Sequence, residues 1–213
     1  MIKKLAFALA ALSISATASA QAYGNLSLGM ASWRGGDWCS TGAFCDREDS
    51  SYRAVLGYRF NSVVSIEGGF IGFGKIRARD AIEVTVGATT ETVGRWVSFD
   101  AAGPALGVAA TFPLGGGKWY GRGRAGLAMM SVKGIQTIDA VLDDDGEVIR
   151  AAEKTTLTST KVQPYLGLGL GYRFTPSVAL EGSIDASRAK FEDGGTSTRS
   201  NLIAVNIGLT FEF

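Results

Sequence analysis

The sequence predicts an all-β protein, an eight-stranded antiparallel up-and-down β-barrel that spans a membrane. Its last segment, Val205 to Phe213, alternates between apolar residues and Asn, Gly, Thr or Glu, which is the pattern of a strand between lipid and lumen. Eight segments alternate in this way, most with roughly the 9 to 11 residues that a tilted membrane strand requires. Short and long connections alternate between them, as in a transmembrane barrel.

The beginning of the chain differs from this pattern. Lys3 and Lys4 are followed by an apolar run from Leu5 to Ile14 and by the small residues Ala18-Ser19-Ala20. This order is typical of a secretory signal peptide, so we expect residues 1–20 to be cleaved before Gln21. Residues 21–213 would then form one outer-membrane β-barrel domain.

The first four strands are predicted at residues 22–33, 51–60, 64–74 and 105–112. In each, apolar side chains occupy alternate positions and therefore lie on one face of the strand. They are Leu26, Leu28 and Met30, then Tyr52, Ala54, Leu56, Tyr58 and Phe60, then Val64, Ile66 and Phe70, and finally Leu106, Val108, Ala110 and Phe112. The first three opposite faces carry polar residues, such as Asn25, Arg53 and Glu67.

The last four strands are predicted at residues 119–130, 162–174, 178–187 and 205–213. Their apolar faces carry Trp119, Ala125, Leu127 and Met129, then Leu166, Leu168, Leu170, Tyr172 and Phe174, then Val178, Leu180 and Ile184, and finally Val205, Ile207, Leu209, Phe211 and Phe213. A soluble lipocalin-like barrel would turn such faces inward and its charges outward. Here the charges share a face with glycine and serine, which favours lipid outside.

The connections predict the orientation. Short turns lie at residues 61–62, 113–117 and 175–177, and each contains turn-forming residues. Long segments run from 34 to 50, 75 to 103, 131 to 161 and 188 to 200, and we expect them to be loops. Both termini lie at the end with the short turns, so that end is predicted to be periplasmic and the long segments extracellular.

The predicted interior face carries charges of both signs. They are Arg53, Arg59, Glu67, Arg122, Arg124, Arg173, Glu181 and Asp185, with Glu212 in the last strand. Because an eight-stranded barrel is just wide enough for its side chains to fill, we expect a luminal network of ion pairs. The alternative is a narrow or gated pore lined by the same residues.

The absence of histidine limits the chemistry of the chain. Small barrels that are enzymes use His in the active site, and without it a Ser nucleophile has no ordinary general base. We therefore expect no enzymatic activity, no catalytic residues, no metal site and no cofactor. The formal net charge of +1 gives no field that would favour nucleic acid.

The two cysteines, Cys39 and Cys45, lie close together in the first long segment. In an exported protein such a pair predicts a disulfide across a loop.

Two long segments contain patterns of their own. Residues 137–156 have alternating arms around an Asp-Gly turn, and Ile82 to Val86 alternates as well. Hairpins there would expose strand edges to a surface protein ligand. Five cations near the outer rim are candidates to contact lipopolysaccharide phosphates: Lys75, Arg77, Arg79, Arg188 and Lys190.

Gly-Tyr-Arg-Phe ends two strands, at 57–60 and 171–174, and the chain ends in Gly208-Leu209-Thr210-Phe211-Glu212-Phe213. With these motifs and the strand pattern, residues 22–213 resemble the OmpA-type family of small outer-membrane β-barrels, which includes the OmpX-like adhesion and resistance proteins. The chain departs from full-length OmpA because it is expected to lack a peptidoglycan-binding domain.

The resemblance implies a monomer in the outer membrane of a Gram-negative bacterium, in contact with outer-membrane lipids and lipopolysaccharide. It implies a structural or surface-interaction role that the extracellular loops carry. The alternative function is a small passive diffusion channel, porin-like, with a charged lumen. The resemblance also implies that Gly208, Phe211 and Phe213 form the signal that the barrel-assembly machinery reads.

Overall fold

The computed structural model describes residues 21–35, 44–86, 89–142, 148–193 and 196–213. The strands are β1 (Ala22–Arg34), β2 (Phe44–Asp46), β3 (Glu48–Arg59), β4 (Val64–Val86), β5 (Thr89–Leu114), β6 (Trp119–Ile138), β7 (Val141–Leu142), β8 (Val148–Arg150), β9 (Glu153–Arg173), β10 (Val178–Asp193) and β11 (Thr196–Glu212). No helix in these ranges is long and apolar enough to cross a membrane. The predicted signal peptide, residues 1–20, lies outside the described residues.

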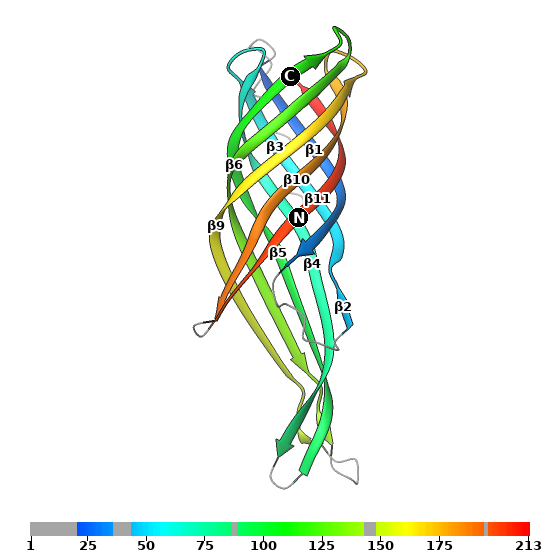
Figure 1. The fold of residues 1–213 in the computed structure, drawn as a ribbon, viewed down its shortest axis with the longest axis vertical. Coiled ribbons are helices and arrows are strands. Elements are labelled where there is room, and N and C mark those ends of the chain that lie inside the picture. Colours follow the sequence, from blue (N-terminus) through cyan, green and yellow to red (C-terminus); the bar gives the residue numbers. More distant parts are fainter. Residues whose placement is uncertain (1–20, 36–43, 87–88, 143–147, 194–195) are drawn as a thin grey trace, which may run out of the picture.

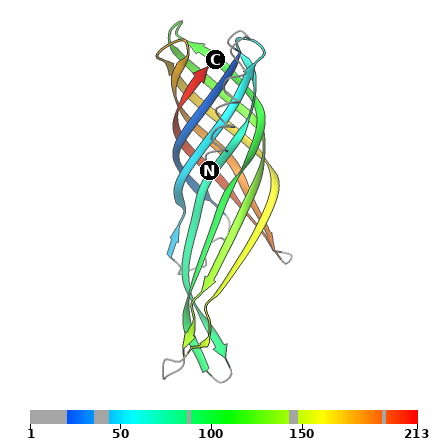
Figure 2. The same cartoon turned by 180° about the vertical axis from the view of Figure 1, so that it is seen from behind.

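Eight long strands form a closed antiparallel ring (Figures 1 and 2). Around the ring the order is β1, β3, β4, β5, β6, β9, β10 and β11, and β11 pairs again with β1. Strands that are neighbours in the chain are neighbours in the ring, which is the up-and-down arrangement. The predicted fold class is confirmed.

Alternation along the strands separates two faces. Outward side chains such as Leu28 and Leu168 are 69% and 72% exposed, whereas Asn25 and Arg53 on the other face are buried. Exposed leucines in such numbers are stable only against lipid or another apolar surface. The outer face is therefore a continuous apolar wall, as the alternation predicts.

The described parts of the long segments, in contrast, are mostly strand and not the loops that the sequence predicts. β4 and β5 pair continuously from Lys75–Asp100 to Val86–Thr89, and β6 and β9 pair as far as Ile138–Glu153. β5 alone has 26 residues, about 85 Å at roughly 3.3 Å per residue. The segment from 188 to 200 also continues as β10 and β11. The strands extend because β-branched residues alternate beyond the membrane-sized part.

This extension forms a structure that we call the arm. It comprises residues 76–86 of β4, 89–99 of β5, 134–138 of β6 and 153–157 of β9, together with β7 and β8. The arm tapers away from the ring at the lower end of Figure 1. β7 pairs with β8 as the predicted hairpin requires, but its Asp-Gly turn lies outside the described residues.

A bulge in β4 marks the start of the arm. The β4–β5 register shifts between Gly72 and Lys75, and Gly74 has a φ of +63°. The extra residue exchanges the two faces of the strand. Ile71 and Phe73 point inward before the bulge, and Ile76 points inward after it.

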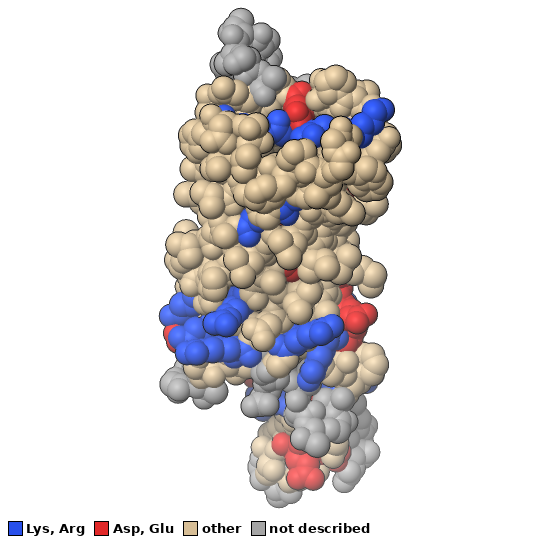
Figure 3. Space-filling model, turned by 45° about the horizontal axis from the view of Figure 1, so that its top comes forward, with Lys and Arg blue, Asp and Glu red and all other residues tan. Residues whose placement is uncertain are grey.

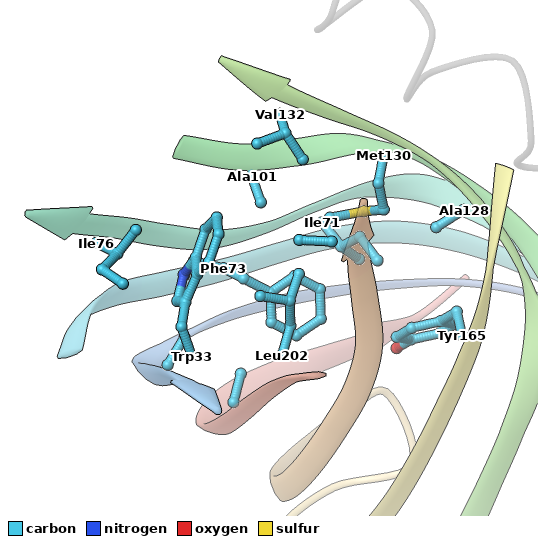
Figure 4. Packing of buried hydrophobic residues seen from close by; sticks show 13 residues of the cluster. Trp33, Ile71, Phe73, Ile76, Ala101, Ala128, Met130, Val132, Tyr165 and Leu202 are labelled. Atoms are coloured by element: carbon cyan, nitrogen blue, oxygen red, sulfur yellow. The ribbon is translucent and has the colours of Figure 1, made fainter. Parts of the chain in front are cut away.

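The interior has a polar and an apolar layer. Toward the arm, side chains from several strands form an apolar cluster that includes Trp33, Phe73, Met130 and Leu202 (Figure 4). Trp33 Nε1 donates a hydrogen bond to the carbonyl oxygen of Phe73 at 3.1 Å, so the buried indole is satisfied. The prediction of a charged lumen is thus incomplete, because this half of the interior is apolar.

One seam of the ring is open beside the arm. The β9–β10 pairing ends at Leu166–Ala186, although both strands continue past that point. Pro164 lies just beyond the last pair and has no N–H to continue the ladder. Its carbonyl oxygen accepts a hydrogen bond from Ser187 Oγ at 2.9 Å instead. Beyond this level β9 and β10 therefore no longer pair through their backbones.

Candidate functional site

The polar layer of the interior is the candidate site. Three arginines, Arg53 from β3 and Arg122 and Arg124 from β6, lie there with Glu67 from β4 and with Glu181 and Asp185 from β10. Each side chain points inward because of its parity on the strand, and each residue is 6% exposed or less. Three positive and three negative charges share this layer, so it is formally neutral.

Glu181 is the centre of the network. Its Oε1 lies 2.5 Å from Arg124 Nη2 and 3.3 Å from Arg53 Nη2, and its Oε2 lies 3.1 Å from Arg122 Nη1. The Tyr120 hydroxyl also donates to Oε2, at 3.3 Å. One fully buried carboxylate thus joins strands from opposite parts of the ring, which a surface carboxylate in water would not do with comparable strength.

Asp185 and Glu67 complete the charge balance. Arg53 Nη1 donates to both oxygens of Asp185 at 2.8 Å. Tyr165 and Asn206 also donate to Asp185, at 2.7 and 2.8 Å. Glu67 accepts from Arg124 Nε at 3.0 Å and from the Tyr23 hydroxyl at 2.6 Å. These donors compensate the cost of burying the carboxylates, which is high for an unpaired charge.

Arginine and tyrosine side chains alternate in a stack on the short-turn side of this layer. Arg122 Cζ lies 4.8 Å from the centroid of the Tyr23 ring and 5.2 Å from that of Tyr120. Arg59 covers Tyr23 at 4.9 Å, and Arg173 covers Tyr120 at 4.7 Å. Three guanidinium groups are therefore interleaved with two rings, in cation–π geometry.

The stack reaches the short-turn end of the ring at Glu212. Arg59 Nη1 and Nη2 donate to the two oxygens of Glu212 at 2.9 and 2.6 Å. Arg173 Nε lies 3.9 Å from Glu212 Oε1. All eight charged residues predicted for the network thus lie inside the ring, but Arg59 and Arg173 form a separate, partly exposed group with Glu212.

The structure brings in side chains that the predicted network did not name. Tyr23, Tyr120, Tyr165, Asn25 and Asn206 are all buried and bonded to its charged groups. Their parity places them on the inner face, and this signal was present in the sequence. What the sequence did not contain was the distance across the barrel, because those partners come from strands far apart in the chain.

The three residues of the predicted assembly signal lie on both faces of β11. Gly208 faces inward, where a Cβ would overlap the backbone of Leu26 and Ser27, while Phe211 and Phe213 lie on the outer wall beside Gly24. Their recognition by the assembly machinery remains a prediction. The predicted disulfide involves Cys39, which lies outside the described residues, and Cys45 is partly buried against the apolar cluster.

Comparison with known proteins agrees with this architecture. The sequence matches the family described as outer membrane protein beta-barrel domain over residues 5–211. No curated protein matches the sequence significantly.

Solved structures with a similar course of the chain include three small outer-membrane barrels. Neisserial surface protein A is 12% identical with a TM-score of 0.46, and the match covers 90% of this chain and 97% of that one. The N-terminal β-barrel domain of Pseudomonas aeruginosa OprF is 13% identical with a TM-score of 0.45, covering 91% and 98%. Ail of Yersinia pestis is 14% identical with a TM-score of 0.44, covering 90% and 99%. Likenesses at this level carry no argument about function.

The family match spans nearly the whole chain, and the ring of eight strands has the apolar exterior and polar interior of a barrel in lipid. The chain belongs to the outer membrane protein beta-barrel domain family, and its place is the outer membrane of a Gram-negative bacterium.

Proposed function

We propose that this barrel is a surface-interaction protein whose arm binds an extended segment of another protein by adding it as a strand. The observation that carries the proposal is the pair of unpaired edges on the arm. Among the described residues, β4 from Asp80 to Val86 pairs only with β5, and β9 from Glu153 to Tyr165 pairs only with β6. Free N–H and C=O groups along an edge are what strand addition uses.

The tip of the arm is packed well enough to hold its edges in place. Val84, Val93 and Val141 form a small buried cluster between the β4–β5 hairpin and β7. Asp80 and Arg95 face each other across β4 and β5, and Arg95 Nε donates to Asp80 Oδ1 at 2.8 Å. The hydrogen bond to Asp80 raises the pKa of Arg95 above its ordinary value. A rigid edge loses little entropy on binding, which favours affinity.

The interior supports a structural role for the barrel itself. Its polar layer is charge-neutral, and the apolar cluster of Trp33 and Phe73 lies on the path toward the arm. An ion crossing that cluster would lose its hydration without a polar replacement. A passive channel is therefore the weaker alternative.

A band of cations supports contact with lipopolysaccharide. Lys75, Arg77 and Arg79 are exposed on the outer face of β4, and Arg188 is exposed on β10 with Lys190 half-buried beside it. Arg79 Cζ lies 4.3 Å from the Trp96 ring. Figure 3 shows Lys and Arg gathered across one level of the face in view, next to a wide band that is mostly uncharged. That level is where phosphates of the outer leaflet would lie if the wide band is in lipid.

The experiment for strand addition removes the arm and keeps the ring. In the trimmed variant, residues 81–94 and 134–157 are each replaced by Asn-Gly, because the flanking pairs Asp80–Arg95 and Lys133–Thr158 are already in hairpin register. Both proteins are placed in lipid nanodiscs and passed over a panel of immobilised extracellular-matrix and serum proteins. We expect the parent to bind at least one of them and the trimmed variant to lose that binding. Equal binding by both would refute the proposal.

The lipopolysaccharide contact has a separate test. The parent and an Arg77→Gln, Arg79→Gln double variant are compared in bilayers with and without lipopolysaccharide. We expect lipopolysaccharide to raise the unfolding temperature of the parent more than that of the variant. An equal rise in both would argue against these two cations.

A further inference from the structure

A small cavity lies where the base of the arm meets β10. Its walls are Val97 and Phe99 from β5, Gly134, Ile135 and Gln136 from β6, Thr155 and Leu157 from β9, and Phe191 from β10. Its volume is about 180 Å³. The walls are mostly apolar, with one amide and one hydroxyl side chain among them.

The shape of this cavity is set by two aromatic rings and a glycine. Phe99 and Phe191 meet edge to face, with centroids 5.4 Å apart and an interplanar angle of 69°. A Cβ on Gly134 would lie 2.9 Å from Phe99 and 3.6 Å from Phe191, so the glycine is what keeps the space open. An apolar cavity of roughly 150 Å³ is large enough for a benzene ring, and small-molecule sites usually begin at about 300 Å³. The space thus fits one apolar side chain.

The cavity is continuous with the free edge of β9. Thr155 and Leu157 line it and belong to the stretch of β9 that pairs only with β6. A strand added beside β9 would turn every second side chain toward the same face as these two residues. The β9–β10 pairing ends at Leu166–Ala186, so among the described residues no strand pairs with this side of β9 along the stretch beside the cavity.

We propose that this cavity is an anchor pocket for one phenylalanine- or leucine-like side chain of an extended polypeptide that pairs with the edge of β9. The inference rests on the proposed function and adds to it what the partner must contain. The edge binds the backbone and accepts many sequences, whereas the pocket selects one apolar residue at a fixed register.

The test uses two labelled nonapeptides of Thr, Ser and Lys, one with a single central Phe and the other with Ser at that position. Fluorescence anisotropy measures their binding to the parent in nanodiscs, to Gly134→Val, which fills the pocket, and to Ser98→Val. The last is a matched control, because Ser98 lies between Val97 and Phe99 and therefore on the opposite face of β5. Val97→Phe fills the pocket from β5 and replaces Gly134→Val if that variant does not insert.

We expect the parent to bind the Phe peptide about tenfold more tightly than the Ser peptide, as burial of one aromatic side chain predicts. The preference should disappear in Gly134→Val and persist in Ser98→Val. If both peptides bind the parent equally and the trimmed variant binds neither, strand addition stands and the pocket is refuted. A preference for the Phe peptide that persists in Gly134→Val also refutes the pocket. If the parent binds neither peptide, the result counts against both the pocket and strand addition.

Discussion

Tyr23 on β1 lies directly opposite Gly57 on β3, and its ring occupies the space where a Cβ of residue 57 would be. The same relationship joins Tyr120 on β6 to Gly171 on β9. In both pairs the glycine lets a tyrosine lie flat against the inner wall, with its hydroxyl directed at Glu67 or Glu181. The glycine and the buried charge network therefore depend on each other.

Substitution of Gly57 should reveal this dependence. A Cβ in Gly57→Ala overlaps the Tyr23 ring, so we expect a loss of about 1 to 3 kcal/mol in the free energy of unfolding. Gly24→Ala is the matched control, because its Cβ would lie 3.4 Å from Leu56 on the outer wall. Urea unfolding in lipid vesicles measures both. Equal losses of unfolding free energy in the two variants would mean that the placement of the Tyr23 side chain does not depend on Gly57.

The second prediction concerns Glu181, which pairs with three arginines. Glu181→Gln leaves the buried layer with one more positive than negative charge. We therefore expect the free energy of unfolding to fall by about 3 to 5 kcal/mol. Glu153→Gln breaks only an exposed pair with Arg150, which is worth less than about 1 kcal/mol. Unfolding of both variants in vesicles compares them. A loss at Glu181 no larger than at Glu153 would show that the network contributes little.

How far the sequence predicts this interior depends on the residue. Alternation placed Arg53, Arg122 and Glu181 inside the ring, because parity on a strand is a local property. It did not predict which of them meet, since those distances depend on the tilt and stagger of the whole ring. The free edge of β9 depends on where its pairing with β10 ends, and Pro164 was the one local sign of it.

The apolar layer and the arm were harder to predict for a different reason. Phe73 and Ile76 both point inward although they have opposite parity, because the bulge at Gly74 lies between them. A glycine in a glycine-rich chain gives no distinct signal of a bulge. The length of a membrane strand does not predict that β5 continues through residues 89–104, because pairing with β4 and β6 holds these strands together outside lipid as well.

The bulge leads to the third prediction. Gly74→Ala meets two costs, a φ of +63° and a Cβ that would overlap the carbonyl oxygen of Ser50. Gly115→Ala has the same φ but open space around its Cβ, so only the backbone cost of roughly 1 to 2 kcal/mol applies. We expect Gly74→Ala to lose more stability than Gly115→Ala in urea unfolding. The reverse order would mean that the bulge relaxes without cost.

The fourth prediction tests whether the lumen conducts. In planar bilayers a protein of residues 21–213 should give no discrete conductance steps, since the apolar layer around Trp33 and Phe73 lies in series with the charges. An Arg122→Ala, Arg124→Ala variant should be less stable and also silent. Insertion is verified by protease protection of the same samples. Reproducible steps in the parent that change in the variant would support the channel alternative.

The last prediction concerns the ion pair that bridges the open seam. Lys161 on β9 lies 2.5 Å from Glu192 on β10, and Lys190 also pairs with Glu192. Hydrogen bonds from Lys161, which has the larger effect, and from Lys190 lower the pKa of Glu192 to about 2. A carboxyl group whose pKa is lowered in the folded state stabilises the fold at pH values above its pKa in the unfolded state, about 4.3. This contribution is lost as the pH falls through the pKa in the folded state.

The bridge should therefore be unchanged between pH 8 and pH 5 and should open as the pH falls toward 2. Spin labels at Thr160 and Ser197, neighbours of the paired residues on either side of the seam, would report the separation as a distance. Glu192→Gln should have the wider distance already at pH 7, and salt should weaken the exposed bridge of the parent. If the distance in the parent does not change down to pH 2 and equals that of the variant throughout, the strands are held by something other than this ion pair.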